Sequence, residues 1–292
     1  MAAGAREDGG PARRVPVVLL HGFAQHADSW GEVARRLRER GHEAVAPELA
    51  GLPGAAGGAG MAGVCAAVDS LCREVAHRAG RLPALAGYSM GGRIALETVQ
   101  RSFGGGSPAG RPCADRPGAG QNADAARPPC CALVLESAGM GPETEGDRIR
   151  FAERNAEWAR RVREEGVEAF MDWWETLPLF ASQRGLPPDV RARLRAGRMS
   201  NDPEGLAFQL EAWGAQHQAL RPRAWGLLRD LAAGGFPVAY FAGELDGKYA
   251  CVAQSAAGLP GVRAVVFPGV GHNVHVEDPD AFVGELCRVL PA

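Results

Sequence analysis

The hydrophobic positions of the chain form short continuous apolar runs, and longer amphipathic stretches lie between several of them. A continuous run is typical of a strand buried on both faces, because a strand with one solvent-facing side alternates apolar and polar residues. Six strands are predicted in this way, at residues 15–23, 42–49, 82–89 and 131–139 and within 236–249 and 262–273. Their alternation with helices predicts a mostly parallel sheet with helices on both faces.

Helices are predicted where apolar residues recur at helical spacing and capping residues mark the ends. They cover residues 29–41, 64–79, 91–103 and 279–290. Ser29 is the expected N-cap of the first helix, and Asp278 is that of the last, where Pro279 takes the first helical position. The glycine-rich segment 51–63 is predicted to be a flexible connector.

Three segments depart from this alternation. Residues 1–14 are predicted to be a disordered tail and residues 104–129 a disordered insertion, because neither can bury enough apolar surface to offset the entropy of ordering. Residues 141–233 instead have the pattern of several amphipathic helices. Five of the six tryptophans lie there: Trp158, Trp173, Trp174, Trp213 and Trp225. We expect this segment to be a helical cap over a site on a core of residues 15–140 and 234–292.

Composition and charge weigh against several classes of protein. The formal net charge of −2 gives no electrostatic basis for binding nucleic acid. No apolar run approaches the roughly 20 residues of a membrane-spanning helix, and the N-terminal residues lack the apolar stretch of a secretory signal, so a cytoplasmic location is expected. The seven cysteines show no zinc-ligand spacing and are expected to be reduced. Arginine is abundant beside a single lysine, Lys248, so each arginine must be argued from its position.

A glycine-flanked serine stands between a predicted strand and a predicted helix. The segment Gly87-Tyr88-Ser89-Met90-Gly91 has the pattern G-x-S-x-G. Its glycines permit a strained turn that exposes the serine hydroxyl, and the N-terminus of the following helix favours nearby negative charge. In this context the pattern predicts a nucleophile elbow with Ser89 as a catalytic residue.

A catalytic serine needs a base, and the base needs an acid that orients it. His272 follows the last predicted strand and Asp246 follows the strand before it, so both fall at carboxyl ends of strands, where parallel sheets carry their sites. The chain order Ser89, Asp246, His272 is that of alpha/beta hydrolases. Glu244 and His275, the latter expected beyond the loop tip, are the rival acid and base.

Backbone N–H groups near Ser89 are candidates for an oxyanion hole. The predicted donors are Met90, on the elbow, and Phe23, in the loop after the first strand, with His21 supporting that loop. No metal-ligand set is apparent, because the closely spaced His272 and His275 have no carboxylate partner in the pattern.

Further motifs narrow the family. "LHGF" followed by Trp30, "GYSMGGRIALE", "LESAG", "WETLPLFASQ", "GELDGKY" and "GHNVHVEDP" together resemble the 2-succinyl-6-hydroxy-2,4-cyclohexadiene-1-carboxylate synthases of menaquinone biosynthesis. The resemblance covers nearly the whole chain from Val15 onward, and "GYSMGGR", "WE-x-LPLF" and "GHNVH-x-E" are its most specific parts. It implies an alpha/beta-hydrolase fold, with a mostly parallel sheet flanked by helices and a helical cap.

The resemblance implies a lyase reaction without a cofactor, in which pyruvate is eliminated from 2-succinyl-5-enolpyruvyl-6-hydroxy-3-cyclohexene-1-carboxylate. By this resemblance His272 deprotonates Ser89, and Ser89 Oγ removes a ring proton without forming an acyl-enzyme. The N–H groups of Phe23 and Met90 stabilise the developing anion.

The substrate of that family carries several carboxylates, which a guanidinium binds better than an ammonium does. Three arginines and two aromatic residues match substrate-binding positions of the family: Arg93, Arg148, Arg198, Tyr88 and Trp174. Lys248 matches a family lysine and is expected to brace the Asp246 loop.

The chain also departs from the family pattern. The segment after the second strand, "PELAGLPGAAGG", lacks the histidine of the usual Pro-Gly-His-Gly turn. A second cap arginine would fall on Phe151 and the acid after it on Asn155, and Arg150 or Arg154 could substitute. These departures bear on binding from the cap rather than on the triad.

Two other functions stay open: a carboxylesterase or carbon–carbon bond hydrolase with the same triad, and a non-catalytic ligand-binding member of the fold. The complete Ser, Asp and His set weighs against the second. The expected partner is a small polycarboxylate substrate, without nucleic acid or membrane insertion, and the expected state is a monomer.

Overall fold

Six strands form one fully parallel sheet in the order β2-β1-β3-β4-β5-β6. A computed structural model describes residues 14–56, 58–103 and 127–291, so nearly all of the predicted tail and of the predicted insertion lie outside the described residues. The strands are β1 (Val17–Leu20), β2 (Ala44–Val45), β3 (Ala84–Tyr88), β4 (Ala132–Glu136), β5 (Val238–Gly243) and β6 (Val262–Phe267).

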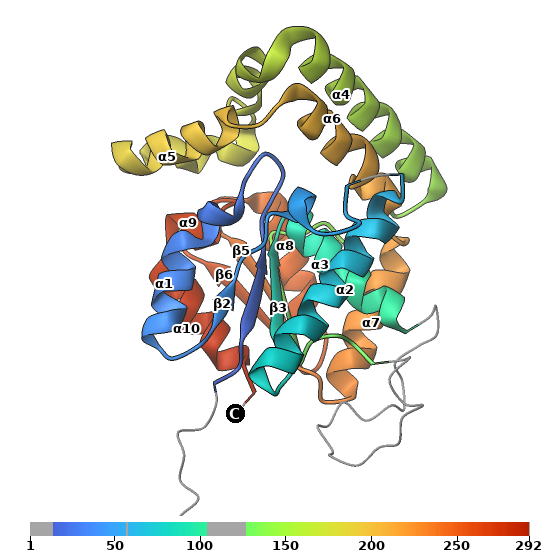
Figure 1. The fold of residues 1–292 in the computed structure, drawn as a ribbon, viewed down its shortest axis with the longest axis vertical. Helices are drawn as coiled ribbons and strands as arrows, with labels where there is room; N and C mark the ends of the chain where they lie inside the picture. The colour runs from blue at the N-terminus through green and yellow to red at the C-terminus, as the bar shows by residue number, and fades with distance from the viewer. Residues whose placement is uncertain (1–13, 57, 104–126, 292) are drawn as a thin grey trace, which may run out of the picture.

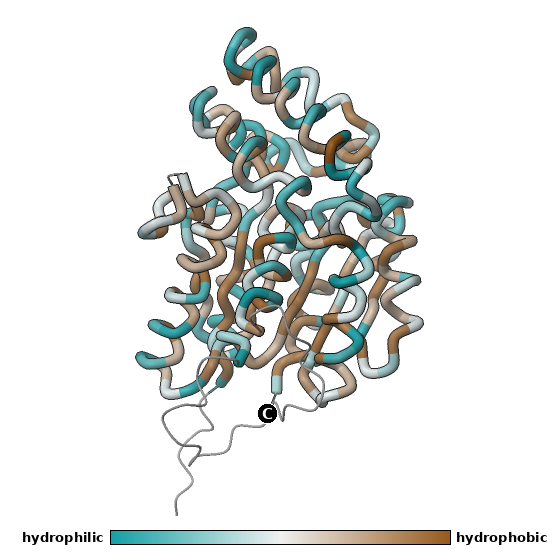
Figure 2. The backbone as a smooth tube through the Cα atoms, turned by 90° about the vertical axis from the view of Figure 1, so that its right-hand side faces the viewer, coloured by the Kyte–Doolittle hydropathy of each residue, from teal (hydrophilic) through white to brown (hydrophobic). Residues whose placement is uncertain are grey.

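Helices cover both faces of this sheet (Figure 1), as the alternating pattern predicts. One layer holds α1 (Gly31–Glu39), α9 (Val274–Glu277) and α10 (Pro279–Val289), and the other holds α2 (Gly60–Ala79), α3 (Met90–Ser102), α7 (Arg221–Ala233) and α8 (Gly247–Ala257). Successive strand residues point to opposite layers: Val18 and Leu20 enter one apolar cluster, and Val17 and Leu19 enter the other. The central strands are accordingly hydrophobic along their length (Figure 2). The predicted fold class is confirmed.

Several element boundaries differ from the prediction. A 3-10 turn, η1 (Ala27–Trp30), precedes α1, and the Ser29 hydroxyl donates to the His26 carbonyl at 2.8 Å, so Ser29 is not an N-cap. Helix α2 begins inside the predicted connector, because Met61 in its first turn is buried in the core. Asp278 does cap α10, accepting a hydrogen bond from Ala281 N–H at 3.0 Å.

A second set of helices lies above the carboxyl ends of the strands (Figure 1). It contains α4 (Glu145–Trp174), η4 (Pro178–Gly185), α5 (Pro188–Met199), α6 (Pro203–Ala212) and η5 (Ala215–His217). Two of these helices, α4 and α6, share an apolar cluster that includes Phe170, Leu206 and, from the loop after β1, Ala24. We call residues 145–217 the cap.

The predicted cap range ran on to residue 233, but α7 has a different place. Its apolar side chains, such as Leu227 and Leu231, are buried in the cluster between the sheet and α2–α3. Helix α7 therefore flanks the sheet, although its amphipathic pattern resembles that of the helices before it.

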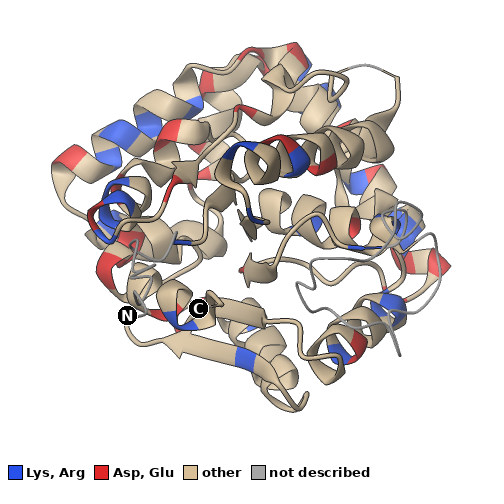
Figure 3. Cartoon of the chain, turned by 60° about the horizontal axis from the view of Figure 1, so that its bottom comes forward, with Lys and Arg blue, Asp and Glu red and all other residues tan. Residues whose placement is uncertain are grey.

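Charged residues of both signs are interspersed over the helices, while the strands carry few (Figure 3). Many of them are paired within one helix, as in Arg35 with Glu32 and Arg160 with Glu157. No helix in the part of the chain that the structure describes is long and apolar enough to cross a membrane.

Candidate active site

Ser89 lies in a sharp turn between β3 and α3. Its φ of 50° and ψ of −104° are strained for a residue with a side chain. The turn also requires close backbone contact, because a Cβ on Gly91 would lie 2.2 Å from the carbonyl oxygen of Leu20 in β1. Small residues are therefore needed beside Ser89, as the nucleophile-elbow pattern indicates.

Ser89, His272 and Asp246 form a continuous hydrogen-bonded chain. His272 Nδ1 lies 2.6 Å from Asp246 Oδ2, and His272 Nε2 lies 3.3 Å from Ser89 Oγ. The imidazole is 2% exposed and the aspartate 5%, so the pair is shielded from water. With Nδ1–H donating to the carboxylate, Nε2 is free to accept the serine proton.

Aromatic rings fix the orientation of His272. The Tyr249 ring centroid lies 5.0 Å from that of the imidazole, the Tyr88 centroid 5.2 Å away, and the Phe180 centroid of the cap 6.1 Å away. Asp246 is held in turn as the N-cap of α8, where it accepts from Tyr249 N–H.

The rival acid and base have other partners. Glu244 is exposed and accepts from Gly269 N–H at 2.9 Å. His275 was expected beyond the loop tip, but it is buried: its Nδ1 lies 2.8 Å from Glu136 Oε2, and its ring stacks on Trp30 at 3.7 Å. This buried pair is not predicted from the sequence, where its only signal is a glutamate at the end of an otherwise apolar strand.

A cavity of about 530 Å³ lies over Ser89, between the core and the cap. Phe23 and Met90, the predicted oxyanion-hole residues, line it beside the serine, as does Trp174 from the cap. Met90 is the first residue of α3, so its N–H has no acceptor one turn earlier in the helix.

Four cations line the cavity, namely Arg93, Arg154, Arg221 and Lys248, and none of its described lining residues is an Asp or Glu. Arg221 is paired with Glu143 at 3.0 Å. Most of the positive charge around the cavity is therefore not neutralised by a carboxylate in the cavity wall.

Arg93 is the most unusual of these cations. Its buried Nε has no hydrogen-bond partner, and its guanidinium forms no ion pair with any residue that the structure describes. Burial lowers the pKa of Arg93, and the nearby positive charge of Arg154 lowers it further. A half-buried guanidinium without a counter-ion is costly unless an anion joins it.

Arg154 projects from α4 into the same cavity. Its guanidinium lies 4.6 Å from the Trp158 ring and 5.2 Å from the Phe151 ring, and it donates to Asn155 Oδ1. Stacking of this kind holds an arginine in place while leaving donors free.

Three of the predicted substrate-binding residues lie outside the cavity. Arg148 donates to the carbonyls of Gln216 and Gln218 at 2.5 and 2.7 Å. Arg198 donates to Glu175 at 2.9 Å and to Gln183 at 2.7 Å.

Tyr88 is the third, and it is buried beneath the loop after β1. A Cβ on Gly22 would lie 2.6 Å from its ring. These three side chains brace the cap, the η4 segment and the loop, and the cavity-lining members of the predicted set are Arg93 and Trp174.

His21 lies in the loop that carries Phe23. Burial lowers the pKa of His21, so the ring is neutral and its Nε2 accepts from Leu49 N–H at 3.1 Å. No cluster of His, Cys, Asp or Glu with the geometry of a metal site occurs among the described residues.

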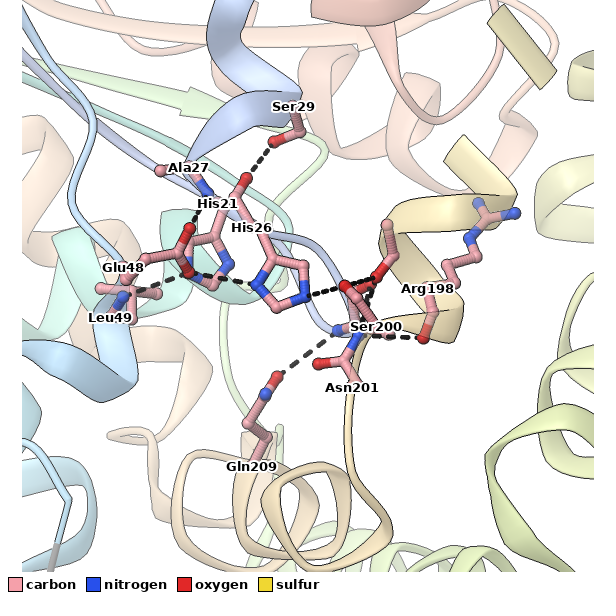
Figure 4. A network of polar contacts seen from close by, with 12 residues as sticks. His21, His26, Ala27, Ser29, Glu48, Leu49, Arg198, Ser200, Asn201 and Gln209 are labelled. Atoms are coloured by element: carbon pink, nitrogen blue, oxygen red, sulfur yellow. Dashed lines mark hydrogen bonds and ion pairs between the residues drawn. The ribbon is translucent and has the colours of Figure 1, made fainter. Parts of the chain in front are cut away.

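A polar network joins the cap to this same loop (Figure 4). His26 bridges Glu48 of the core, at 3.2 Å, and Ser200 at the end of α5, at 3.1 Å. Asn201 and Gln209 of the cap bond the backbone of Ala24. The cap is thus attached beside Phe23.

The profile of the alpha/beta hydrolase family matches residues 17–285. The chain belongs to the alpha/beta hydrolase family. Among solved structures, MenH from S. aureus has a similar fold, with a TM-score of 0.74 at 23% identity over 97% of this chain and 96% of that one. An esterase from Thermogutta terrifontis has a TM-score of 0.65 at 22% identity over 94% and 88%.

Sequence relatives place the chain more narrowly within the alpha/beta hydrolases. The 2-succinyl-6-hydroxy-2,4-cyclohexadiene-1-carboxylate synthase of Salmonella paratyphi B is 31% identical over 277 residues, which are 94% of this chain and 93% of that protein. A Bacillus subtilis (strain 168) protein, named provisionally for the same activity, is 38% identical over 152 residues, about half of each chain at 52% and 53%. The resemblance that the motifs predict is confirmed.

Proposed function

We propose that this enzyme eliminates pyruvate from 2-succinyl-5-enolpyruvyl-6-hydroxy-3-cyclohexene-1-carboxylate to give 2-succinyl-6-hydroxy-2,4-cyclohexadiene-1-carboxylate, a step of menaquinone biosynthesis. The full-length relatives named for this activity support it. The observation that carries it in this chain is the unpaired Arg93 beside Ser89, because a neutral ester would leave that cation without a partner.

In the proposed mechanism Ser89 is a base rather than a nucleophile toward carbon. His272 Nε2 takes the Ser89 proton while Asp246 stabilises the resulting imidazolium. Ser89 Oγ removes a ring proton, and the negative charge that develops is stabilised by the N–H groups of Phe23 and Met90. The carbon–oxygen bond to the enolpyruvyl group then breaks, and the leaving enolpyruvate takes a proton and becomes pyruvate.

Arg93 and Arg154 are proposed to bind substrate carboxylates, and Trp174 to cover the ring. Arg154 stands one helical turn from Phe151, where the family has its second cap arginine, so it is the proposed substitute for that residue. In this proposal three of the predicted residues do not contact the substrate. They hold the cap, the η4 segment and the loop after β1 in place: Arg148, Arg198 and Tyr88.

The test is turnover in ¹⁸O-labelled water. Elimination consumes no water, so pyruvate should form with no label in the ring product, and with pyruvate labelled only as fast as free pyruvate exchanges its ketone oxygen. Ser89→Ala should lower kcat by about 10²–10⁴-fold, the range for a positioned acid–base group.

The alternative is a true esterase with the same triad. Release of alcohol from simple esters, with a burst of covalent enzyme at Ser89 and no pyruvate from the cyclohexene substrate, would replace the lyase by that alternative. A cytoplasmic location and a monomeric state stay predictions.

A further inference from the structure

The carboxylate of Glu277 stands behind the loop that carries His272. Its Oε2 accepts from Gly271 N–H at 2.8 Å, and its Oε1 accepts from Asn273 N–H at 3.3 Å. These two residues flank His272 in the sequence. One carboxylate thus holds the backbone on both sides of the imidazole.

The same carboxylate also contacts the cap. Ser182, in η4, donates its hydroxyl to Glu277 Oε1 at 3.0 Å. The fit is close, since a Cβ on Gly271 would lie 1.9 Å from Ser182 Oγ. Phe180, two residues earlier in η4, places its ring edge against the His272 ring. The η4 segment therefore rests directly on the histidine loop.

We propose that Glu277 is a positioning residue that couples the seating of η4 to the placement of His272, for the elimination proposed above, on which this inference rests. A carboxylate can only accept hydrogen bonds. Because the carboxylate of Glu277 is half-buried, its charge is stabilised by its three hydrogen-bond donors. When Ser182 leaves, Oε1 keeps only the longer bond from Asn273, and the loop loses part of its support. His272 then reaches its working distance from Ser89 less often.

The partners of Glu277 are consistent with this role. Burial raises the pKa of Glu277, and hydrogen bonds from Gly271, Ser182 and Asn273 oppose that rise. His275 is held separately by Glu136, so that end of the loop has a support that does not come from the cap. The hydrogen bonds from Ser182, Gly271 and Asn273 join the cap to the His272 end of the loop.

Two variants test the coupling. Ser182→Ala removes only the cap donor, and Glu277→Gln keeps the shape but presents an N–H₂ group to one of the backbone donors. Glu244→Gln is the matched control, because Glu244 also accepts from a backbone N–H of this region, that of Gly269, but has no hydrogen bond or ion pair with a described residue of the cap.

The first readout is amide hydrogen exchange, which needs no substrate. Ser182→Ala should speed exchange in residues 178–185 and also at Gly271 and Asn273, whose N–H groups it does not touch. Glu277→Gln should do the same more strongly, and Glu244→Gln should leave 178–185 unchanged. Faster exchange in 178–185 alone for Ser182→Ala would overturn the proposal.

The second readout is the split between kcat and KM on the cyclohexene substrate. Glu277→Gln should lower kcat about 10- to 100-fold, as expected for a displaced base, with KM changed less than about threefold. Unchanged kcat with native exchange would also overturn the proposal. If Glu277→Gln does not fold, Ser182→Ala decides by exchange. If the wild-type enzyme releases no pyruvate, the proposed function fails, and the exchange result still decides the coupling.

Discussion

Arg93, Arg148 and Arg198 illustrate how little a residue type says about its role. All three match family arginines in the sequence, yet two of them already donate to carbonyl, amide or carboxylate oxygens of the protein. Only Arg93 is left with a buried, unpartnered nitrogen in the cavity over Ser89. The role of each arginine is decided by hydrogen-bond partners from segments that are distant in the sequence. No local sequence pattern contains those partners.

The first prediction concerns the geometry of Arg93. Arg93→Lys keeps a positive charge but loses the planar fork, so kcat/KM for the cyclohexene substrate should fall by about one to two powers of ten, as each lost charge-assisted bond costs roughly 1.5–3 kcal/mol. Arg93→Ala should lose more. Steady-state kinetics give the values, with Arg150→Lys as a surface control. Full kcat/KM for Arg93→Ala would show that Arg93 does not bind a substrate carboxylate.

The triad was the part of the site most open to prediction from sequence. Ser89, Asp246 and His272 each follow a strand of a parallel sheet, and such positions meet at one edge of the sheet. The buried pair of His275 and Glu136 was not predictable in this way, because it depends on how the short helix α9 brings His275 to the last residue of β4.

At the level of elements, the apolar runs correctly predicted where the strands lie, and the capping residues correctly predicted where α10 begins. The misjudged boundaries have physical causes. Glycine-rich sequence hid the first turn of α2, which tertiary burial of Met61 stabilises, and the 3-10 turn before α1 took Ser29 away from the cap position. Tertiary contacts override weak local propensity at such places.

The turn at Ser89 yields a prediction of its own. Gly91→Ala would bring a Cβ against the Leu20 carbonyl, and because backbone cannot yield as a side chain can, the free energy of unfolding should fall by about 1–3 kcal/mol or more. Turnover should fall as well, since α3 must shift and move Ser89. Chemical denaturation and kcat measure the two effects. Gly247→Ala is the control, because a Cβ there meets nothing within 4 Å; equal behaviour of the two variants would contradict the steric account.

For the whole molecule, the sheet and its two helical layers followed from the alternation of patterns, but the division between cap and core did not. Helices α6 and α7 both have an apolar face, and only the surface that each one meets distinguishes them. The same limit applies to the cavity, whose walls come from segments more than 150 residues apart.

Surface ion pairs predict how stability depends on pH. Hydrogen bonds from arginines lower the pKa of Glu32, Glu157 and Asp280 below their usual values of 4.5 and 3.8. A carboxyl with a lowered folded pKa stabilises the fold above its unfolded pKa, and that contribution is lost as pH falls through the folded value. The melting temperature should therefore drop below about pH 4.5.

Salt provides the control for this prediction. The pairs are exposed, so 0.5 M NaCl, at a Debye length of about 4 Å, should flatten the fall in melting temperature between about pH 4.5 and 3. Burial raises the pKa of Glu97. Its effect on stability therefore has the opposite sign: the melting temperature falls as pH rises from the unfolded pKa of Glu97 through its folded pKa. A melting temperature that is constant or rising from pH 4.5 to 3 would show that the surface pairs contribute nothing.

Lys248 provides a single side-chain site for amine-directed labelling. It is the only lysine in the sequence, it is exposed, and it lines the cavity beside Tyr249. Apart from an N-terminal amine, an amine-directed reagent therefore finds one side chain in this sequence to modify, and that side chain lies at the cavity over Ser89. A fluorophore attached there would sense occupancy of the cavity directly, whereas coupling the protein to a resin through its amines would tend to obstruct the site it was meant to display.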